Sequence, residues 1–302
     1  MQITSSYLQT NYKYTHPSFG DCAIKQSGDK LVTHFTHLGR DLRINRQRLA
    51  DYAFNMIRNP KLGCEFIFCG CSDGSEIFDI MMALAYKFYK EKMPLDQLPK
   101  FKAFDLSQKM IDIAKTGRIN ISNAGIQYVK EAYPDYPFWI NQQGIMYYPD
   151  DNIPYLERKI GSPIKNSYQF NPKLLEKIDF YRGSMLSEFQ KIDSDTCKIV
   201  VCRNAARYNP ESYQRESARV LDKNLKPHSL VIVGICDEYN PTDKDNNIII
   251  DMSKGAKGCE RLPFTDELFR NNFHHNEYLS PDHLIYQKTY PADSSYIANL
   301  IY

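Results

Sequence analysis

The stretch Glu65-Phe-Ile-Phe-Cys-Gly-Cys-Ser-Asp-Gly-Ser-Glu76 decides the fold of this chain. A short apolar run enters a turn that contains Gly70 and Gly74, and apolar residues at helical spacing follow from Ile77 to Leu84. This order predicts a strand, a glycine loop and a helix, the layout in which an α/β protein holds a nucleotide-like cofactor against backbone N–H groups. Glycine suits such a loop because a Cβ atom would keep the ligand away from the main chain, and because these turns often need φ > 0. An ordinary strand-to-helix turn has the same pattern, so the interpretation depends on other segments.

A second strand is predicted at Phe101–Asp105, and it ends in an acid. The residues from Leu106 to Ala114 have a helical pattern, and Ser107 is suited to be the N-cap of that helix. An acid at the tip of the second strand is where α/β folds hold ribose hydroxyl groups, because a carboxylate accepts two hydrogen bonds from a diol. The alternative for Asp105 is capping of the helix that follows it.

Two more strands of the buried type follow along the chain. The segment Cys197–Asn204 contains an apolar run from Ile199 to Cys202 and ends in polar residues, and Ser229–Gly234 follows a helical segment. Strands that alternate with helices favour a parallel, doubly wound sheet, so the sequence predicts an α/β fold.

Length and composition limit the classes of function. At 302 residues the chain has room for one large domain with an insertion, and its formal net charge of +2 gives no strong field for nucleic acid. No apolar stretch approaches the roughly 20 residues that span a bilayer, and no secretory signal pattern is present, so we expect no membrane insertion. The eight cysteines include no CxxC pair and the histidines form no closed ligand set. We therefore expect reduced thiols, no metal and a cytoplasmic protein.

The predicted organisation is a lead-in segment at residues 1–35 and one domain at residues 36–302. Within the domain, residues 126–177 interrupt the alternation of strands and helices with aromatic residues and prolines. This segment has enough apolar side chains to pack, so we interpret it as a small inserted subdomain. A polar excursion at residues 237–260 precedes the last predicted strand, Leu284–Tyr290.

Taken in order, these segments resemble the CheR family of S-adenosylmethionine-dependent protein-glutamate methyltransferases. The family's C-S-x-G-E-E loop corresponds to Cys71–Glu76, its A-T-D-I-S strand end to Ala103–Ser107, and its C-R-N-V-L-I-Y-F signature to Cys202–Asn209. Its L-K-P-G-G segment corresponds to Leu225–Ser229, and an upstream N-x-T-x-F-F-R-D segment corresponds to His34–Asp41. The resemblance runs in order from about residue 33 to residue 236.

This resemblance implies a class I methyltransferase-like fold that uses S-adenosylmethionine and releases S-adenosylhomocysteine. By the same resemblance, Asp105 would hold the ribose, Glu76 would meet the polar part of the cofactor, and the backbone at Ser184–Met185 would border the adenine. Asn204 would contact the methionine part. The implied cofactor-binding residues are Thr36, Arg40, Gly70, Ser72, Gly74, Glu76, Asp105, Ser184, Met185, Asn204 and Ala205.

The resemblance further implies methyl transfer to a side-chain carboxylate of a protein substrate, in a role related to chemotaxis. A carboxylate is ionised at neutral pH, so the transfer needs no strong general base. The implied catalytic residues are Arg40, which is suited to hold a carboxylate, and Tyr208, which can donate one hydrogen bond to it. Each has an alternative: Arg40 as a surface ion-pair partner of Asp41, and Tyr208 as a half-buried aromatic residue at a strand end.

Two other functions stay open: a methyltransferase of the same fold that acts on a small molecule, and a non-catalytic protein that senses S-adenosylmethionine or its product. Arg40 and Tyr208 distinguish catalysis from sensing, because a sensor needs no group that holds an acceptor. The chain departs from the family at Ser75, where the family has Glu, and at His34 and Ser184, each of which replaces Asn.

Overall fold

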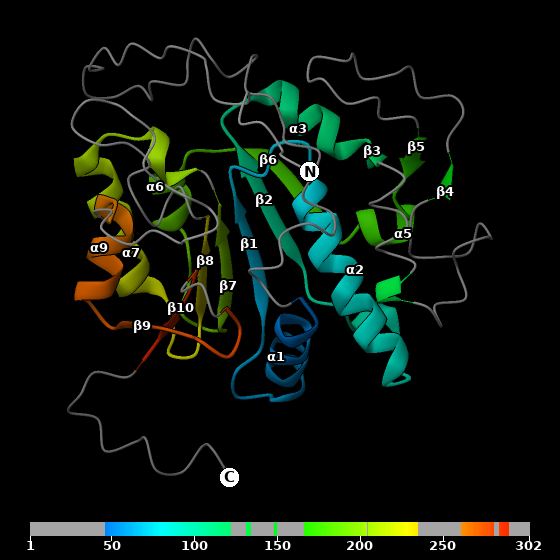
Figure 1. The fold of residues 1–302 in the computed structure, drawn as a ribbon, viewed down its shortest axis with the longest axis horizontal. Coiled ribbons are helices and arrows are strands. Elements are labelled where there is room, and N and C mark those ends of the chain that lie inside the picture. Colours follow the sequence, from blue (N-terminus) through cyan, green and yellow to red (C-terminus); the bar gives the residue numbers. More distant parts are fainter. Residues whose placement is uncertain are drawn as a thin grey trace, which may run out of the picture.

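Strand β1 (Glu65–Cys69) lies inside a seven-stranded sheet that runs through the middle of the fold (Figure 1). The computed structural model describes residues 46–121, 131–133, 148–149, 166–203, 205–234, 261–280 and 284–289. Across the sheet the strand order is β6-β2-β1-β7-β8-β10-β9. The other strands of the sheet are β2 (Phe101–Asp105), β6 (Ile178–Arg182), β7 (Lys198–Cys202), β8 (Leu230–Val233), β9 (Phe273–His275) and β10 (Ile285–Lys288).

The strands β6, β2, β1, β7 and β8 pair in parallel, whereas β10 is antiparallel to both of its neighbours. The chain builds the sheet outward from β1 in one direction and then from β7 in the other. The carboxyl ends of β1 and β7 are therefore the topological switch point, where open α/β sheets bind ligands. The prediction of an α/β fold with a doubly wound, mostly parallel sheet is confirmed.

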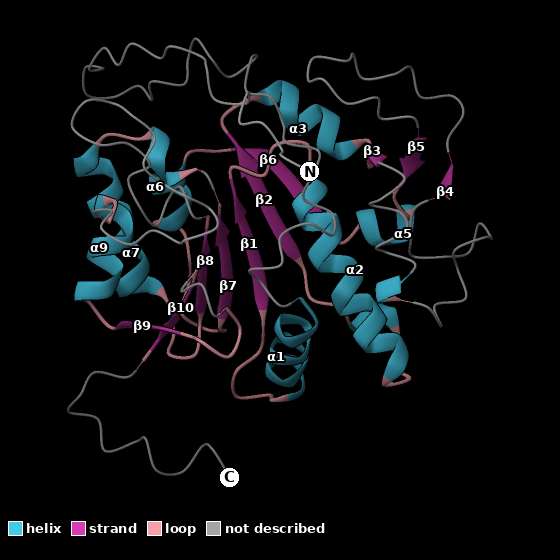
Figure 2. Ribbon diagram, viewed as in Figure 1, coloured by secondary structure: helices cyan, strands magenta, loops and turns pink. Residues whose placement is uncertain are grey.

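Helices cover both faces of this sheet (Figure 2), and each face has its own core cluster of buried side chains. Successive residues of a strand point to opposite faces, so β1 contributes Phe66 and Phe68 to one cluster and Ile67 and Cys69 to the other. The first cluster is packed by α1 (Arg46–Arg58), α2 (Ser75–Lys90) and α3 (Gln108–Lys115), and the second by α6 (Met185–Phe189), α7 (Glu211–Asn224) and α9 (Pro263–Arg270).

A smaller antiparallel sheet, in the order β3-β5-β4, follows α3 at one side of the molecule (Figure 1). Two of its strands fall within the predicted insertion at 126–177, and the third precedes it. Most of that insertion lies outside the described residues, so its boundaries stay a prediction. The elements are β3 (Arg118–Ile121), β4 (Tyr148–Pro149), β5 (Asn166–Gln169) and the short helix α5 (Pro172–Leu175), and the 3-10 helices are η2 (Leu95–Gln97) and η3 (Ala206–Tyr208).

The predicted lead-in segment at residues 1–35 and the polar excursion at 237–260 lie outside the described residues. The apolar spacing from Thr36 to Ile57 predicts a helix; residues 36–45 of that segment also lie outside the described residues, and α1 covers its later part. Within the part of the chain that the structure describes, no helix is long and apolar enough to cross a membrane.

Candidate functional site

Four of the segments predicted to form the site meet at the carboxyl-end edge of the parallel strands. The glycine loop follows β1, Asp105 ends β2, Ser184–Met185 follow β6, and Ala205 follows β7. These strands are consecutive neighbours in the sheet, so the four segments are adjacent in space although they are far apart in the sequence. The predicted residues Thr36, Arg40 and Asn204 lie outside the described residues.

The glycine loop has three residues in the left-handed region of backbone conformation: Gly70 (φ 67), Ser72 (φ 52) and Gly74 (φ 83). A Cβ atom on Gly70 would lie 2.9 Å from the Cβ atom of Ala205, so glycine permits the loop to contact the end of β7. On the other side, the N–H group of Gly70 donates a hydrogen bond to the Phe104 carbonyl oxygen at 2.9 Å. The loop is thus held between the ends of β2 and β7.

Asp105 ties the glycine loop to the start of α3. Its Oδ2 atom accepts a hydrogen bond from the Ser72 N–H group at 3.0 Å, and its Oδ1 atom accepts one from the Ser107 N–H group at 2.9 Å. Burial raises the pKa of the Asp105 carboxyl, and these backbone hydrogen bonds oppose the rise. Each oxygen of an ionised carboxylate has a further lone pair, so this orientation leaves acceptor capacity for a diol.

The capping alternative for Asp105 has a basis in these contacts, and the ribose interpretation stays a prediction. The carboxylate takes part in the helix start, as the capping alternative requires, while the N-cap itself is Ser107, whose hydroxyl oxygen accepts a hydrogen bond from Met110 N–H.

Glu76, in the first turn of α2, forms an ion pair with Arg203 at the end of β7. The Arg203 side chain is only 10% exposed, so this pair is largely shielded from water. The Glu76 carboxylate, which the resemblance assigned to the cofactor, therefore also links the first turn of α2 to the end of β7. The sequence suggested Glu76 as a contact residue but gave no sign of this partner.

The glycine loop also contains a buried carboxylate, Asp73, which the sequence pattern did not single out. Its Oδ1 atom accepts hydrogen bonds from the Ser75 N–H group at 3.1 Å and the Ser75 hydroxyl at 2.7 Å. Asp73 is 3% exposed, and burial raises the pKa of its carboxyl despite those hydrogen bonds. Ser75 stands where the CheR family has Glu, and here it donates two hydrogen bonds to the Asp73 carboxylate.

The segment after β6 is held at the same edge. The Gly183 N–H group donates to the Asp105 carbonyl oxygen at 3.0 Å, and the Met185 sulfur lies 3.7 Å from Cys202 Sγ. Ser184 contacts Ser187 through their hydroxyl groups at 3.1 Å. The N–H group of Leu186, in the first turn of α6, donates to the Tyr213 hydroxyl at 3.0 Å; Tyr213 is a second residue that the sequence did not indicate.

After β7 the chain enters η3, which places Tyr208 at the surface with 38% of the residue exposed. The guanidinium of Arg207 lies 5.6 Å from the centre of its ring. The exposure of Tyr208 is compatible with the half-buried aromatic residue of the alternative interpretation, which stays open. Since Arg40 is outside the described residues, the catalytic roles of Arg40 and Tyr208 stay predictions.

A cavity of about 250 Å³ lies elsewhere, near the amino ends of β1, β2 and β6. Four of the charged side chains in its wall form ion pairs with one another, Lys102 with Glu65 at 2.8 Å and Lys191 with Glu188 at 2.7 Å, and Asp179 also lines it. Among the described residues no group of three or more His, Cys, Asp or Glu side chains has the arrangement of a metal site. We therefore assign no ligand to this cavity.

No family model matches the sequence, and no curated protein matches it either. Among solved structures, an O-methyltransferase family protein from Burkholderia thailandensis matches 80% of this chain and 56% of its own, with 11% identity and a TM-score of 0.38. Geranyl diphosphate C-methyltransferase from Streptomyces coelicolor A3(2) matches 78% of this chain and 65% of its own, with 9% identity and a TM-score of 0.34. This chain spans less than two thirds of the length of both proteins.

A third match is a putative S-adenosylmethionine-dependent methyltransferase from Listeria monocytogenes, with 11% identity, a TM-score of 0.33, and coverage of 80% of this chain and 100% of that chain. The assignment of the fold rests on the strand order and strand directions. A sheet ordered β6-β2-β1-β7-β8-β10-β9 with β10 antiparallel, and a glycine loop after its first strand, defines a class I methyltransferase-like α/β fold.

Proposed function

We propose that this protein is a methyltransferase that binds S-adenosylmethionine at the carboxyl-end edge of its sheet. The observation that carries the proposal is Asp105, whose two carboxylate oxygens are oriented by the N–H groups of Ser72 and Ser107 beside the glycine loop. A carboxylate fixed in this way suits the two adjacent hydroxyl groups of a ribose.

The other residues at this edge fit the remaining parts of the cofactor. The open backbone of the loop at Gly70 and Ser72 suits close approach of the ligand, and the buried Met185 offers an apolar neighbour for a flat adenine ring. Thr36, Arg40, Gly74, Glu76, Ser184, Asn204 and Ala205 complete the proposed cofactor site. When bound, S-adenosylmethionine supplies a methyl group on a positively charged sulfur.

For the chemistry, the chain needs chiefly to align an acceptor with that methyl group and to exclude water. We propose, from the resemblance to the CheR family, that the acceptor is a carboxylate on a protein. Arg40 would hold this carboxylate, and the Tyr208 hydroxyl would donate a hydrogen bond to one of its oxygens. The exposure of Tyr208 supports an acceptor that arrives from the surface.

Calorimetry with S-adenosylhomocysteine tests the cofactor site. We expect the wild-type protein to bind and Asp105→Asn to bind roughly tenfold or more weakly, because the amide keeps the size but loses one acceptor and the charge. Asp112→Asn is the matched control, since Asp112 lies on the neighbouring helix α3 and accepts a hydrogen bond at the surface from Gln108 at 2.8 Å. No binding by the wild-type protein, or equal binding by Asp105→Asn, would contradict the proposal.

Methyl-labelled cofactor in a lysate tests the acceptor. Base-labile label on protein supports a carboxyl methyl ester, and label in small molecules alone replaces the protein acceptor with the small-molecule alternative. A small-molecule acceptor is the kind named for the Streptomyces coelicolor enzyme. Tight binding without any transfer would favour the sensing function.

A further inference from the structure

Strands β1 and β7 each begin directly after a cysteine. Cys64 precedes β1 and Cys197 precedes β7, and the two strands pair in parallel from Glu65 and Lys198 onward. The Glu65 N–H group donates a hydrogen bond to the Cys197 carbonyl oxygen at 3.1 Å, and the Cys197 N–H group donates one to the Leu62 carbonyl oxygen at 3.0 Å. The two cysteines therefore lie side by side at the amino ends of these neighbouring strands.

Both cysteine side chains point to the same face of the sheet. The Glu65 and Lys198 side chains form an ion pair at 3.0 Å, so the first residues of β1 and β7 share one face. Successive residues of a strand alternate between faces, so each preceding cysteine is on the other face. Cys64 and Tyr52 of α1 pack there against the first core cluster. Burial raises the pKa of the Tyr52 hydroxyl, and Cys197 and Cys64 both add to the rise, so both thiols lie near this hydroxyl.

We propose that Cys64 and Cys197 are a modification site, at which a low-molecular-weight disulfide oxidises the two free thiols to a bond that joins the amino ends of β1 and β7. Opposed residues of neighbouring strands are about 4.8 Å apart, within the roughly 4.4–6.8 Å that separates the Cα atoms of a disulfide. The alternative is packing of two small apolar side chains, which predicts that both thiols stay reduced. The pair lies at the end of β1 opposite to the glycine loop, so its oxidation does not depend on the proposed function.

Thiol–disulfide exchange balances the atoms and electrons of this step. Of the described cysteines only Cys64 is partly exposed, so its thiolate attacks the reagent first, forms a mixed disulfide and releases one thiol of the reagent. The Cys197 thiolate then attacks the Cys64 sulfur and releases the second thiol. The two protein thiols lose two electrons in total, the S–S bond of the reagent gains them, and the two protons pass to the released thiols.

The surroundings of Cys64 make the first attack slow at neutral pH. Burial raises the pKa of the Cys64 thiol; Cys197 and Glu65 add to the rise, and Lys198 opposes it. The thiolate is the nucleophile, so its fraction limits the rate. We therefore expect disulfide formation to become faster by up to roughly tenfold for each pH unit between about pH 7 and pH 9.

The thiol of Cys197 responds to pH in the same direction. Burial raises its pKa, and Lys226, Lys198 and a hydrogen bond with Ser229 oppose the rise. The Tyr52 hydroxyl, which lies near both thiols, stays protonated in this range because its own pKa is raised. Neither thiol of the pair has the lowered pKa of a catalytic cysteine, so the expected role of the bond is to stabilise the fold.

Peptide mapping of the full-length protein tests the bond. The folded protein is incubated with oxidised glutathione at about pH 8.5 and the remaining thiols are alkylated. Trypsin then separates residues 62–87, which contain Cys64, from residues 192–198, which contain Cys197. We expect these two peptides to be linked in wild type and unlinked in Cys64→Ala, a change at a partly exposed position. Cys202→Ala is the matched control: Cys202 ends β7 and is fully buried, so this variant should keep the link.

The stability of the oxidised protein is the second readout. The bond closes the long chain segment between residues 64 and 197, so the urea midpoint of unfolding should be higher for the oxidised than for the reduced form of wild type and of Cys202→Ala. The two forms of Cys64→Ala should have equal midpoints. Residues 192–198 that stay alkylated in wild type, or residues 62–87 linked to residues 199–203 instead, would overturn the proposal. Equal midpoints for oxidised and reduced wild type would contradict the stabilising role.

Discussion

Gly70 is the position at which the loop tolerates a side chain least. Its φ of 67 disfavours any residue with a Cβ atom, and that atom would lie 2.9 Å from Ala205 Cβ, which is close to the main chain and cannot move aside. We expect Gly70→Ala to lower the free energy of unfolding by about 1–2 kcal/mol, and to weaken S-adenosylhomocysteine binding in the same titration.

Gly63→Ala is the matched control. Gly63 has a φ of 63, and a Cβ atom there would lie 2.9 Å from Thr196 Cγ2, but it precedes β1 at the opposite end of the strand. This variant should lose stability to a similar degree and keep its affinity. Equal loss of affinity in both variants would mean that Gly70 acts through stability alone.

Asp73 should make the stability of the protein depend on pH. Burial raises the pKa of this carboxyl above the value of the unfolded chain, so the folded state binds the proton more tightly. The ionised form therefore costs stability near neutral pH, and the cost disappears as pH falls toward about 4. We expect the free energy of unfolding of wild type, relative to Asp73→Asn, to increase as pH is lowered over this range in urea denaturation.

Asp193 should make the stability of the protein depend on pH in the opposite direction, and the same urea denaturation measures it. Its hydrogen bond with Lys198, at 2.8 Å, lowers the pKa of the Asp193 carboxyl, so its stabilising contribution is present above the unfolded value and is lost as pH falls. Wild type should therefore lose stability relative to Asp193→Asn as the solution is acidified. Parallel trends for the two variants would contradict this assignment.

Local residue patterns predicted local contacts well and long-range ones poorly. Ser107 was recognisable as an N-cap because the cap and its partner are three residues apart. The Glu76–Arg203 pair joins residues 127 positions apart, so it depends on which strands are neighbours and no local pattern contains it. Asp73 was missed because a carboxylate in a turn usually faces water, whereas this one is covered.

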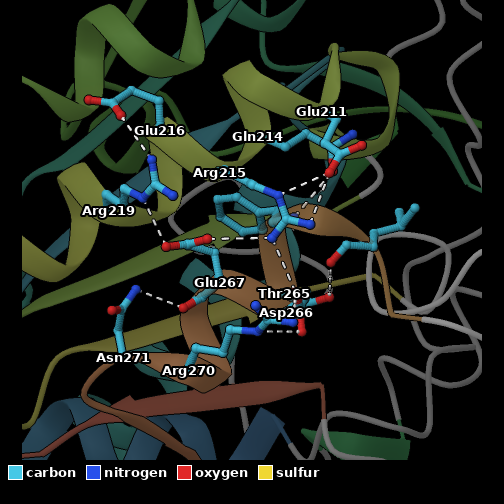
Figure 3. A network of polar contacts seen from close by, with 12 residues as sticks. Glu211, Gln214, Arg215, Glu216, Arg219, Thr265, Asp266, Glu267, Arg270 and Asn271 are labelled. Atoms are coloured by element: carbon cyan, nitrogen blue, oxygen red, sulfur yellow. Dashed lines mark hydrogen bonds and ion pairs between the residues drawn. The ribbon is translucent and has the colours of Figure 1, made fainter.

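The helices α7 and α9 are joined by a network of ion pairs (Figure 3). Glu267 of α9 pairs with Arg219 at 2.9 Å and with Arg215 at 3.4 Å, and its side chain is only 12% exposed. We expect Glu267→Gln to lower the free energy of unfolding by about 1 kcal/mol at low salt and by less at high salt, because the change removes two pairs of a network.

Glu216→Gln is the control for this network. Glu216 pairs with Arg219 at 3.8 Å between two side chains that are each about half exposed, so its loss should change stability by roughly 0.2 kcal/mol or less. A loss at Glu216 equal to that at Glu267, or no salt dependence at Glu267, would show that the network contributes through packing and not through charge.

Among the elements, long and strongly patterned ones were predictable and short ones were not. The strand pattern at 65–69 and 101–105 and the helical pattern after Gly74 match β1, β2 and α2. β4 has two residues and β9 has three, which is too few for an alternating pattern. The antiparallel direction of β10 was also hidden, because direction depends on its neighbours in the sheet and not on its own residues.

For the molecule as a whole, the alternation of strands and helices predicted the doubly wound sheet, and the sheet order then brings four distant segments to one edge. The glycine loop, Asp105 and the start of α6 follow β1, β2 and β6. Because these strands are hydrogen-bonded neighbours in one sheet, the sheet fixes the three segments relative to one another. The position of the proposed site thus depends on the order of the strands in the sheet. The sequence indicated the site residues only through the series of segments that resemble the CheR family.

The most direct test of the central claim is hydrogen–deuterium exchange with and without S-adenosylhomocysteine. The account predicts slower exchange with the ligand at residues 70–76, 105–107 and 183–186, which follow β1, β2 and β6 at the carboxyl-end edge, and no change around Glu65, Lys102 and Asp179 at the opposite end. Protection at that opposite end, or none at the three edge segments with ligand bound, would contradict it.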